Sequence, residues 1–174
     1  MKIVAFLQNM WVRNPAKARA MIQRDPTGKL REKLIAYALF AGCLTGRRLK
    51  AALGEDYCSR IVWDECSPTI ADNPKDYHAP DQRHIEAVIQ KHQPDVVICF
   101  SKPACAVVRA ACREDAMIFI PCCHPAARGN EPLAQIKAVR LVLEELEQSV
   151  CMHLEVRHCE THIECAGCGQ VLLP

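Results

Sequence analysis

The amino-acid sequence predicts an α/β protein with three layers, in which a parallel sheet of about four strands is covered by helices on both faces. Four short apolar runs typical of buried strands alternate along the chain with longer segments of helical periodicity. Strands that alternate with helices imply right-handed crossovers and therefore a parallel sheet. The length of 174 residues and the hydrophobic content of 50% fit one domain with such a core.

The four predicted strands are short apolar runs, each followed by polar residues. The first covers residues 3–7, the second residues 60–63, and the clearest buried run covers residues 96–100. The fourth begins at Ala116, is β-branched at two positions and leads to His124. Ligands of open α/β sheets bind outside the carboxyl ends of the strands, so a histidine in this place is a candidate for chemistry.

Helical segments are predicted between and after these strands. Residues 28–53 have a mostly helical pattern with a break around residues 42–46, after which a second short helix begins. Asp81 is suited to cap a helix with one apolar face, and Ser101 is suited to cap the next. The last helical stripe ends at about Val150.

Polar side chains follow every predicted strand. The carboxyl ends of parallel strands lie at one edge of the sheet, so we expect these side chains to come together there. They are Gln8 and Asn9, Asp64 and Glu65, Ser101 and Lys102, and His124 with Arg128. Folding does not require polar residues at all four strand ends, and we interpret their coincidence as a functional site.

The charge is small overall but unevenly distributed. The formal net charge is +2, yet residues 29–50 hold six basic residues against one acidic residue. A local basic patch is suited to phosphate contact, although a solvated helix face gives the same pattern. We expect a cytoplasmic protein that binds no membrane, because no apolar run is long enough to span one and Gln8 and Asn9 interrupt the first run too early for a signal peptide.

The last 24 residues are rich in cysteine and histidine and differ from the rest of the chain. Twelve cysteines in a cytoplasmic protein favour reduced thiols and metal binding over a disulfide framework. Cys165 and Cys168 form a Cys-x-x-Cys pair that suits a structural zinc site, with Cys159 and His162 as the nearest second pair. Cys151, His153 or His158 could replace either member of that second pair. We therefore expect an α/β domain over residues 1–150 and a zinc-binding tail over residues 151–174.

With these residues assembled, the chain resembles the uracil-DNA glycosylase superfamily over residues 3–148. That superfamily has a Gly-Gln-Asp-Pro or Gly-Ile-Asn-Pro motif after its first strand and a His-Pro motif after its last. Here Gln8 and Asn9 stand at the first place, without the glycine and proline, and His124-Pro125 stands at the second. Residues 45–49 resemble a turn of small members, and Ser67-Pro68 resembles their Asn-x-x-Pro motif.

The resemblance implies a DNA glycosylase, which flips a nucleotide out and hydrolyses its N-glycosidic bond to leave an abasic site. His124 would donate a hydrogen bond to the leaving base, where charge develops. Asn9 would hold the attacking water and Gln8 would support the turn. Trp11 is a candidate for stacking on the flipped base, although a core position is equally consistent with its place. The residues expected to contact DNA phosphates are Arg47, Arg48, Lys102 and Arg128.

Glu65, with Asp64 beside it, stands where the superfamily has an asparagine that reads the base. An ionised carboxylate only accepts hydrogen bonds, and the amine of cytosine is its matching partner. This favours a cytosine-type base, for example a hypermodified base of phage DNA in a defence role. Glu65 could equally cap a turn or pair with an arginine.

Three other functions stay open. The chain could be a uracil-DNA repair glycosylase, or a nucleotide or nucleoside hydrolase that uses the same sheet edge. It could also be a non-catalytic nucleic-acid-binding module with a zinc element. No cofactor is expected for catalysis itself.

Overall fold

The computed structural model describes residues 1–8, 10–25, 27–73, 75–112, 117–150, 156–158, 163–165 and 171–173, with side chains as far as Gln148. The chain divides into two compact units, Met1–Val139 and Arg140–Pro174. Across the described residues, no helix is both long and apolar enough to cross a membrane.

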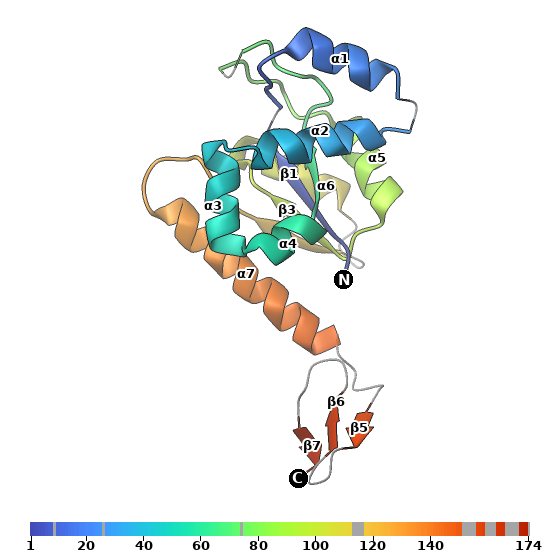
Figure 1. Ribbon diagram of the computed structural model, residues 1–174, viewed down its shortest axis with the longest axis vertical. Helices are drawn as coiled ribbons and strands as arrows, with labels where there is room; N and C mark the ends of the chain where they lie inside the picture. The colour runs from blue at the N-terminus through green and yellow to red at the C-terminus, as the bar shows by residue number, and fades with distance from the viewer. Residues whose placement is uncertain are drawn as a thin grey trace. The chain divides into compact units, whose positions relative to one another are not determined.

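A four-stranded, all-parallel sheet forms the centre of the first unit (Figure 1). Its strands are β1 (Ile3–Leu7), β2 (Val62–Glu65), β3 (Val96–Cys99) and β4 (Ile118–Pro121), in the spatial order β2-β1-β3-β4. Every residue of β1 is buried, as expected for a central strand covered on both faces. The predicted α/β class and the parallel sheet are confirmed.

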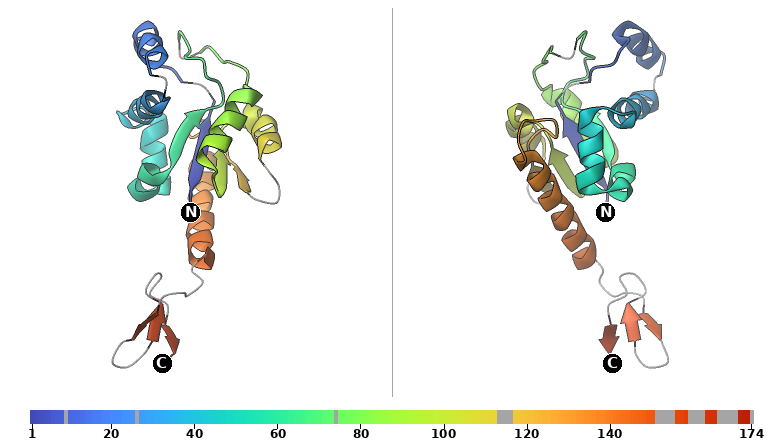
Figure 2. Two further views of the ribbon diagram at one scale, coloured as in Figure 1. Left: turned by 90° about the vertical axis from the view of Figure 1, so that its right-hand side faces the viewer. Right: turned by 60° about the vertical axis from the view of Figure 1, so that its left-hand side comes forward.

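Four helices connect β1 to β2 on one side of the sheet (Figure 2). They are α1 (Pro15–Gln23), α2 (Lys29–Phe40), α3 (Leu44–Leu53) and α4 (Glu55–Arg60). The sequence predicted α2 and α3 but not α1 and α4. The Asn14 side chain begins α1 by accepting a hydrogen bond from the Lys17 amide at 3.1 Å, and Pro15 occupies its first turn.

The opposite side of the sheet is covered by α5 (Gln82–His92) and α6 (Cys105–Ala111), as Figure 2 shows. Asp81 caps α5 as predicted, since its side chain accepts a hydrogen bond from the His84 amide at 3.0 Å. The core between these layers joins strand residues such as Val4 and Phe6 to Ile85 and Val108.

Two local predictions are wrong. Ser101 begins the short 3-10 helix η1 (Lys102–Ala104) without a side-chain cap, and its Oγ is buried with no partner among the described residues. The second strand was expected at residues 60–63, but β2 begins two residues later, because α4 continues through Arg60. Asp64 and Glu65 therefore belong to β2 itself and do not follow it.

The helix α7 (Glu131–Val150) ends where the last helical stripe was expected to end. The second unit also contains β5 (Val156–His158), β6 (Ile163–Cys165) and β7 (Val171–Leu173), which form an antiparallel sheet. The units divide within α7, between Val139 and Arg140, whereas the sequence placed the boundary at residue 150.

The zinc ligands proposed from the sequence are not tested by this structure. Cys159, His162 and Cys168 lie outside the described residues. Cys165 is the last residue of β6, and its side chain is not described. The zinc site stays a prediction.

Candidate active site at the carboxyl edge of the sheet

A cavity of about 140 Å³ opens at the carboxyl ends of β1, β2 and β4. Its walls combine apolar and polar side chains and come from the strand ends, from α2 and from the start of α3. An acidic and a basic side chain, Glu65 and His124, both line this cavity. The lining residues are Leu7, Met10, Trp11, Ile35, Ala38, Leu39, Cys43, Thr45, Glu65 and His124.

Glu65 is the last residue of β2 and is 5% exposed. Its Oε2 atom is buried and has no hydrogen-bond partner among the residues that the structure describes. Burial raises the pKa of Glu65 to about 8, and the neighbouring Asp64 charge adds to this against the opposing effect of Arg31. At neutral pH the side chain is therefore mostly a neutral carboxyl, which has both an O–H donor and an acceptor.

His124 lies three residues beyond β4. Its Nδ1 atom accepts a hydrogen bond from the Ala126 amide at 3.2 Å, and burial lowers its pKa. An imidazole that is neutral and accepts at Nδ1 has its proton on Nε2. His124 is thus a neutral hydrogen-bond donor in the wall of the cavity.

The loop that carries His124 is fastened to α3. Arg48 donates from Nη1 to the carbonyl oxygens of Pro125 at 2.8 Å and Ala127 at 2.7 Å. On the other side, the Cys123 amide donates to Oε1 of Gln135 at 3.0 Å. These bonds hold the imidazole in place, so Arg48, which was expected at a phosphate, has a positioning role.

Asp64 does not line the cavity, although the sequence placed it with Glu65 as a base-binding residue. Its Oδ1 accepts from Nε and Nη2 of Arg31 at 3.3 and 3.1 Å and lies 3.3 Å from Nε2 of His84. Burial alone would raise the pKa of Asp64, but the His84 hydrogen bond and the Arg31 charge hold it below its usual value. Asp64 is therefore an ionised group in a buried structural cluster.

Arg31 fastens α2 to the end of β2. Besides Asp64, its guanidinium donates to the carbonyl oxygens of Ser67 at 3.0 Å and Pro68 at 2.8 Å. In the sequence, Arg31 is recognisable only as one member of a basic run. The signal that could have found it is its i, i+4, i+8 spacing with Ile35 and Leu39, which places all three on the buried face of α2.

The remaining cations expected at phosphates are exposed. Lys102 and Arg128 line one cavity of about 390 Å³ at the ends of β3 and β4, together with Glu131. Arg47 lies on the exposed face of α3 and donates to the Gly42 carbonyl at 3.0 Å. The structure thus brings Lys102 and Arg128 together at the edge of the sheet that carries the candidate site.

The three residues that the sequence predicted as site residues after β1 differ in their position relative to the cavity. Asn9, the predicted holder of the attacking water, lies outside the described residues. Gln8 is half-buried and is absent from the cavity lining. Trp11 does line the cavity, is 43% exposed, and forms an isolated parallel bridge with Ala71.

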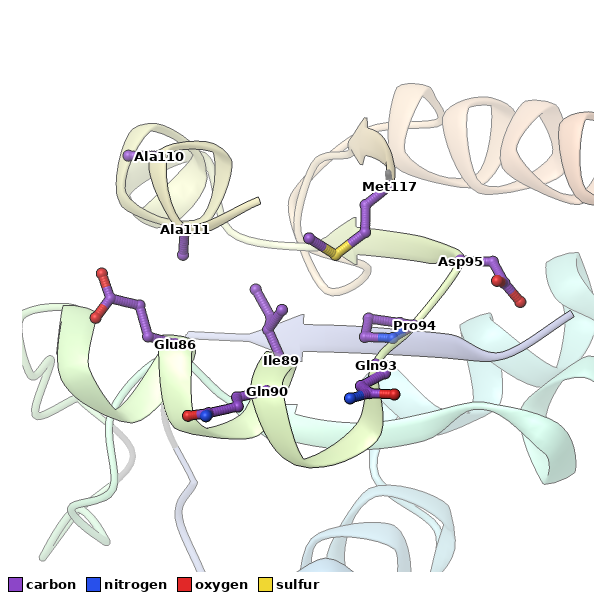
Figure 3. Close-up of a pocket in the computed structure, with 9 residues that line it drawn as sticks. All are labelled: Glu86, Ile89, Gln90, Gln93, Pro94, Asp95, Ala110, Ala111 and Met117. Atoms are coloured by element: carbon purple, nitrogen blue, oxygen red, sulfur yellow. The ribbon is translucent and has the colours of Figure 1, made fainter. Parts of the chain in front are cut away.

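A larger cavity of about 570 Å³ lies between α5 and α6, near the start of β3 (Figure 3). Its two carboxylates, Glu86 and Asp95, lie at opposite ends of it, and Asp95 already accepts a hydrogen bond from the Lys2 amide at 2.6 Å. Its other described lining residues are neutral amide, proline or apolar side chains. The candidate catalytic groups, Glu65 and His124, lie in the smaller cavity.

No model of a known protein family matches the chain, and a search of curated proteins finds no match either.

Proposed function

We propose that this protein is a DNA glycosylase that excises a pyrimidine base flipped into the cavity between Glu65 and His124. The observation that carries the proposal is one small cavity lined by both Glu65 and His124. The buried Oε2 of Glu65 has no hydrogen-bond partner among the described residues, and the His124 imidazole is held at Nδ1 by the Ala126 amide. An unsatisfied buried oxygen costs stability unless a ligand pairs with it. Perturbed ionisable groups in a cavity at the strand ends are typical of active sites.

The size of the cavity supports a single six-membered ring. Its volume is about 140 Å³. An engineered apolar cavity of about 150 Å³ binds benzene, so a pyrimidine ring is the matching class of base. A base that carries a sugar-sized addition exceeds this volume, which weighs against glucosylated cytosine as the substrate.

The proposed chemistry gives His124 the role of a neutral donor. Cleavage of the N-glycosidic bond leaves negative charge on the departing base, and the Nε2–H of His124 would donate a hydrogen bond to a base oxygen as this charge develops. A low imidazole pKa suits this role because the ring stays uncharged before the bond breaks. The attacking water is assigned to Asn9 on sequence grounds alone.

Glu65 would read the edge of the base. A neutral carboxyl can accept from the cytosine amine and donate to the ring nitrogen, or accept from uracil N3–H and donate to its oxygen. A preference for cytosine alone requires an ionised carboxylate, and a Glu65 pKa of about 8 leaves this carboxyl mostly neutral. Uracil is therefore a second candidate beside a cytosine with a small or no addition.

The test is incubation with matched oligonucleotides that carry uracil, cytosine, 5-hydroxymethylcytosine or a glucosylated cytosine, followed by alkali. Strand cleavage at uracil or at a small cytosine base is expected, since alkali cleaves only where an abasic site was formed. In the same assay, His124→Ala removes the proposed donor. His92→Ala is the matched control, because His92 contacts Glu32 and lies outside the cavity. If no substrate gives an abasic site, the protein is not a glycosylase of these bases.

Two other results would favour the alternative functions. DNA binding without cleavage would favour a binding module, and cleavage of free nucleosides alone would favour a nucleoside hydrolase.

A further inference from the structure

A second cavity adjoins the candidate active site and has no role in the function proposed so far. It measures about 310 Å³ and lies between the start of α1 and the second half of α2. We call it the α1–α2 groove. The residues that line it are Trp11, Val12, Arg13, Asn14, Lys17, Ala18, Met21, Leu34, Tyr37 and Ala38.

Large apolar side chains in the groove are unusually exposed. Tyr37 is 73% exposed, Trp11 43% and Met21 37%. Single exposed apolar residues are common, but a contiguous patch with two aromatic rings marks a binding surface. The aromatic faces are therefore available to a flat, apolar partner.

The charges around the groove select the kind of partner. Arg13 and Lys17 are exposed and line it, and its lining contains no acidic residue. Among the described residues, neither side chain takes part in an ion pair. Aromatic rings beside unpaired cations are the combination by which proteins hold single-stranded nucleic acids, with bases stacked and phosphates paired to cations.

The groove adjoins the active-site cavity. Trp11 and Ala38 line both, so a nucleotide in the cavity has its neighbour in the strand at the mouth of the groove. In a duplex that neighbouring base is paired and stacked inside the helix, and it reaches Tyr37 only after it is unpaired. A single strand presents the base without this cost.

We propose that the α1–α2 groove stacks the base next to the flipped nucleotide, so that the protein takes its substrate from single-stranded DNA. This inference rests on the proposed function, because that function identifies the adjoining cavity as the place of the flipped nucleotide. The recognition itself rests on Trp11, Tyr37, Arg13 and Lys17.

Binding is measured by fluorescence anisotropy of the full chain with three labelled probes: a thymidine single strand, an abasic single strand of equal length, and a duplex. The thymidine strand is expected to bind most tightly. Tyr37→Ala is expected to weaken its binding by about 5- to 100-fold, the effect of losing one stacked base. The same variant should leave binding of the abasic strand unchanged, and Tyr37→Phe should restore binding of the thymidine strand.

Tyr77→Ala is the matched control, because Tyr77 is 72% exposed and lies outside the groove. Trp11 supplies an independent optical readout. The other tryptophan, Trp63, is 3% exposed, so quenching of tryptophan emission by the thymidine strand reports stacking on Trp11.

Two results would overturn the inference: unchanged binding of the thymidine strand by Tyr37→Ala, or a duplex bound as tightly as the single strand. The first would leave an apolar segment of a partner protein as the occupant of the groove. These binding measurements do not depend on excision. If Tyr37→Ala weakens binding but the wild type forms no abasic product, the groove binds nucleic acid and the protein is not a glycosylase. If the wild type forms abasic product but Tyr37→Ala binds normally, only the proposal for the groove is wrong.

Discussion

Burial raises the pKa of Glu65 and lowers the pKa of His124, so both side chains are neutral near pH 7, and each suits the proposed reaction in that state. A neutral carboxyl has a donor that a carboxylate lacks, and a neutral imidazole with its proton on Nε2 donates without carrying charge into the cavity. Asp64, the neighbour of Glu65, stays ionised because Arg31 and His84 reach it. Two adjacent carboxyls in one strand thus have different protonation states because their surroundings differ.

Glu65→Gln is expected to change how stability depends on pH. Below the ordinary pKa of 4.5 the carboxyl is protonated in both states, and between 4.5 and about 8 it is ionised only in the unfolded chain. The wild type therefore loses about 1.4 kcal/mol of unfolding free energy per pH unit across this window from Glu65, and the loss stops above pH 8.

Denaturant unfolding of wild type and variant from pH 5 to 9 measures this difference in slope. Glu86→Gln, at an exposed carboxyl of α5, is the control and should keep the wild-type slope. Parallel pH profiles for the wild type and Glu65→Gln would show that the folded chain ionises Glu65 at an ordinary pH.

His124→Ala is expected to slow excision by roughly 10²–10³, the effect of removing one donor aimed at developing charge. Affinity for DNA should change little, since phosphate contacts come from cations elsewhere. Single-turnover excision and a binding titration on the same oligonucleotide separate the two quantities. Full excision by His124→Ala would reduce the histidine to a turn residue.

Among the elements, α3 and the loop after β4 form the pair on which catalysis would depend. Arg47 and Arg48 are adjacent in α3, yet Arg48 donates to two carbonyls of the His124 loop and Arg47 donates to the Gly42 carbonyl beside its own helix. The close approach of α2 and α3 is set by Gly46, where a Cβ would lie 1.9 Å from the Leu39 carbonyl oxygen. A small residue there lets α3 come near enough to the loop.

Arg48→Met is expected to lower the excision rate about 10-fold or more, because hydrogen bonds from a charged donor to the loop are worth about 1.5–3 kcal/mol. The salt dependence of DNA binding should stay as in the wild type. Arg47→Met should do the opposite: it should reduce the slope of log affinity against log salt by about 1 and leave the rate at saturating DNA unchanged. A reduced salt slope in Arg48→Met would place its guanidinium at a phosphate.

Elements with a strong periodic pattern were predictable, and weaker ones were not. β1, β3 and α5 follow from continuous apolar runs or a one-sided apolar face, and Asp81 marks the start of α5. α1 was missed because it has one buried residue, Ala18, and therefore little pattern. The short α4 occupies part of the segment assigned to the second strand, which moved Asp64 and Glu65 into β2.

On the scale of the whole molecule, the meeting of the strand ends was predictable from the sequence, but several side-chain partners were not. Glu65 and His124 meet in one cavity because parallel strands share a carboxyl edge. The neutral state of Glu65 and the loop-holding role of Arg48 depend on contacts between residues far apart in the chain, which no local pattern reveals. The same is true of Arg31, whose partners lie 33 to 37 residues away.

The second unit gives a prediction about metal content. Purified protein is expected to contain about one equivalent of zinc, and Cys165→Ser should lose it and lower the melting temperature, since structural zinc binding contributes to folding. Cys43→Ser is the control, because Cys43 is an exposed thiol that caps α3 and serine caps helices well. Metal analysis of protein purified without chelators checks the prediction, and absence of zinc would contradict it.

Helix α2 separates two spaces that do different work in the proposed reaction. Ile35 and Leu39 face the base cavity, Leu34 and Tyr37 face the α1–α2 groove, and Ala38 borders both. A substitution that tilts or shifts this helix enlarges one space at the expense of the other. The choice of base and the binding of the neighbouring base are therefore coupled through α2. A variant selected for a wider base pocket is expected to change its preference between single-stranded and duplex DNA as well.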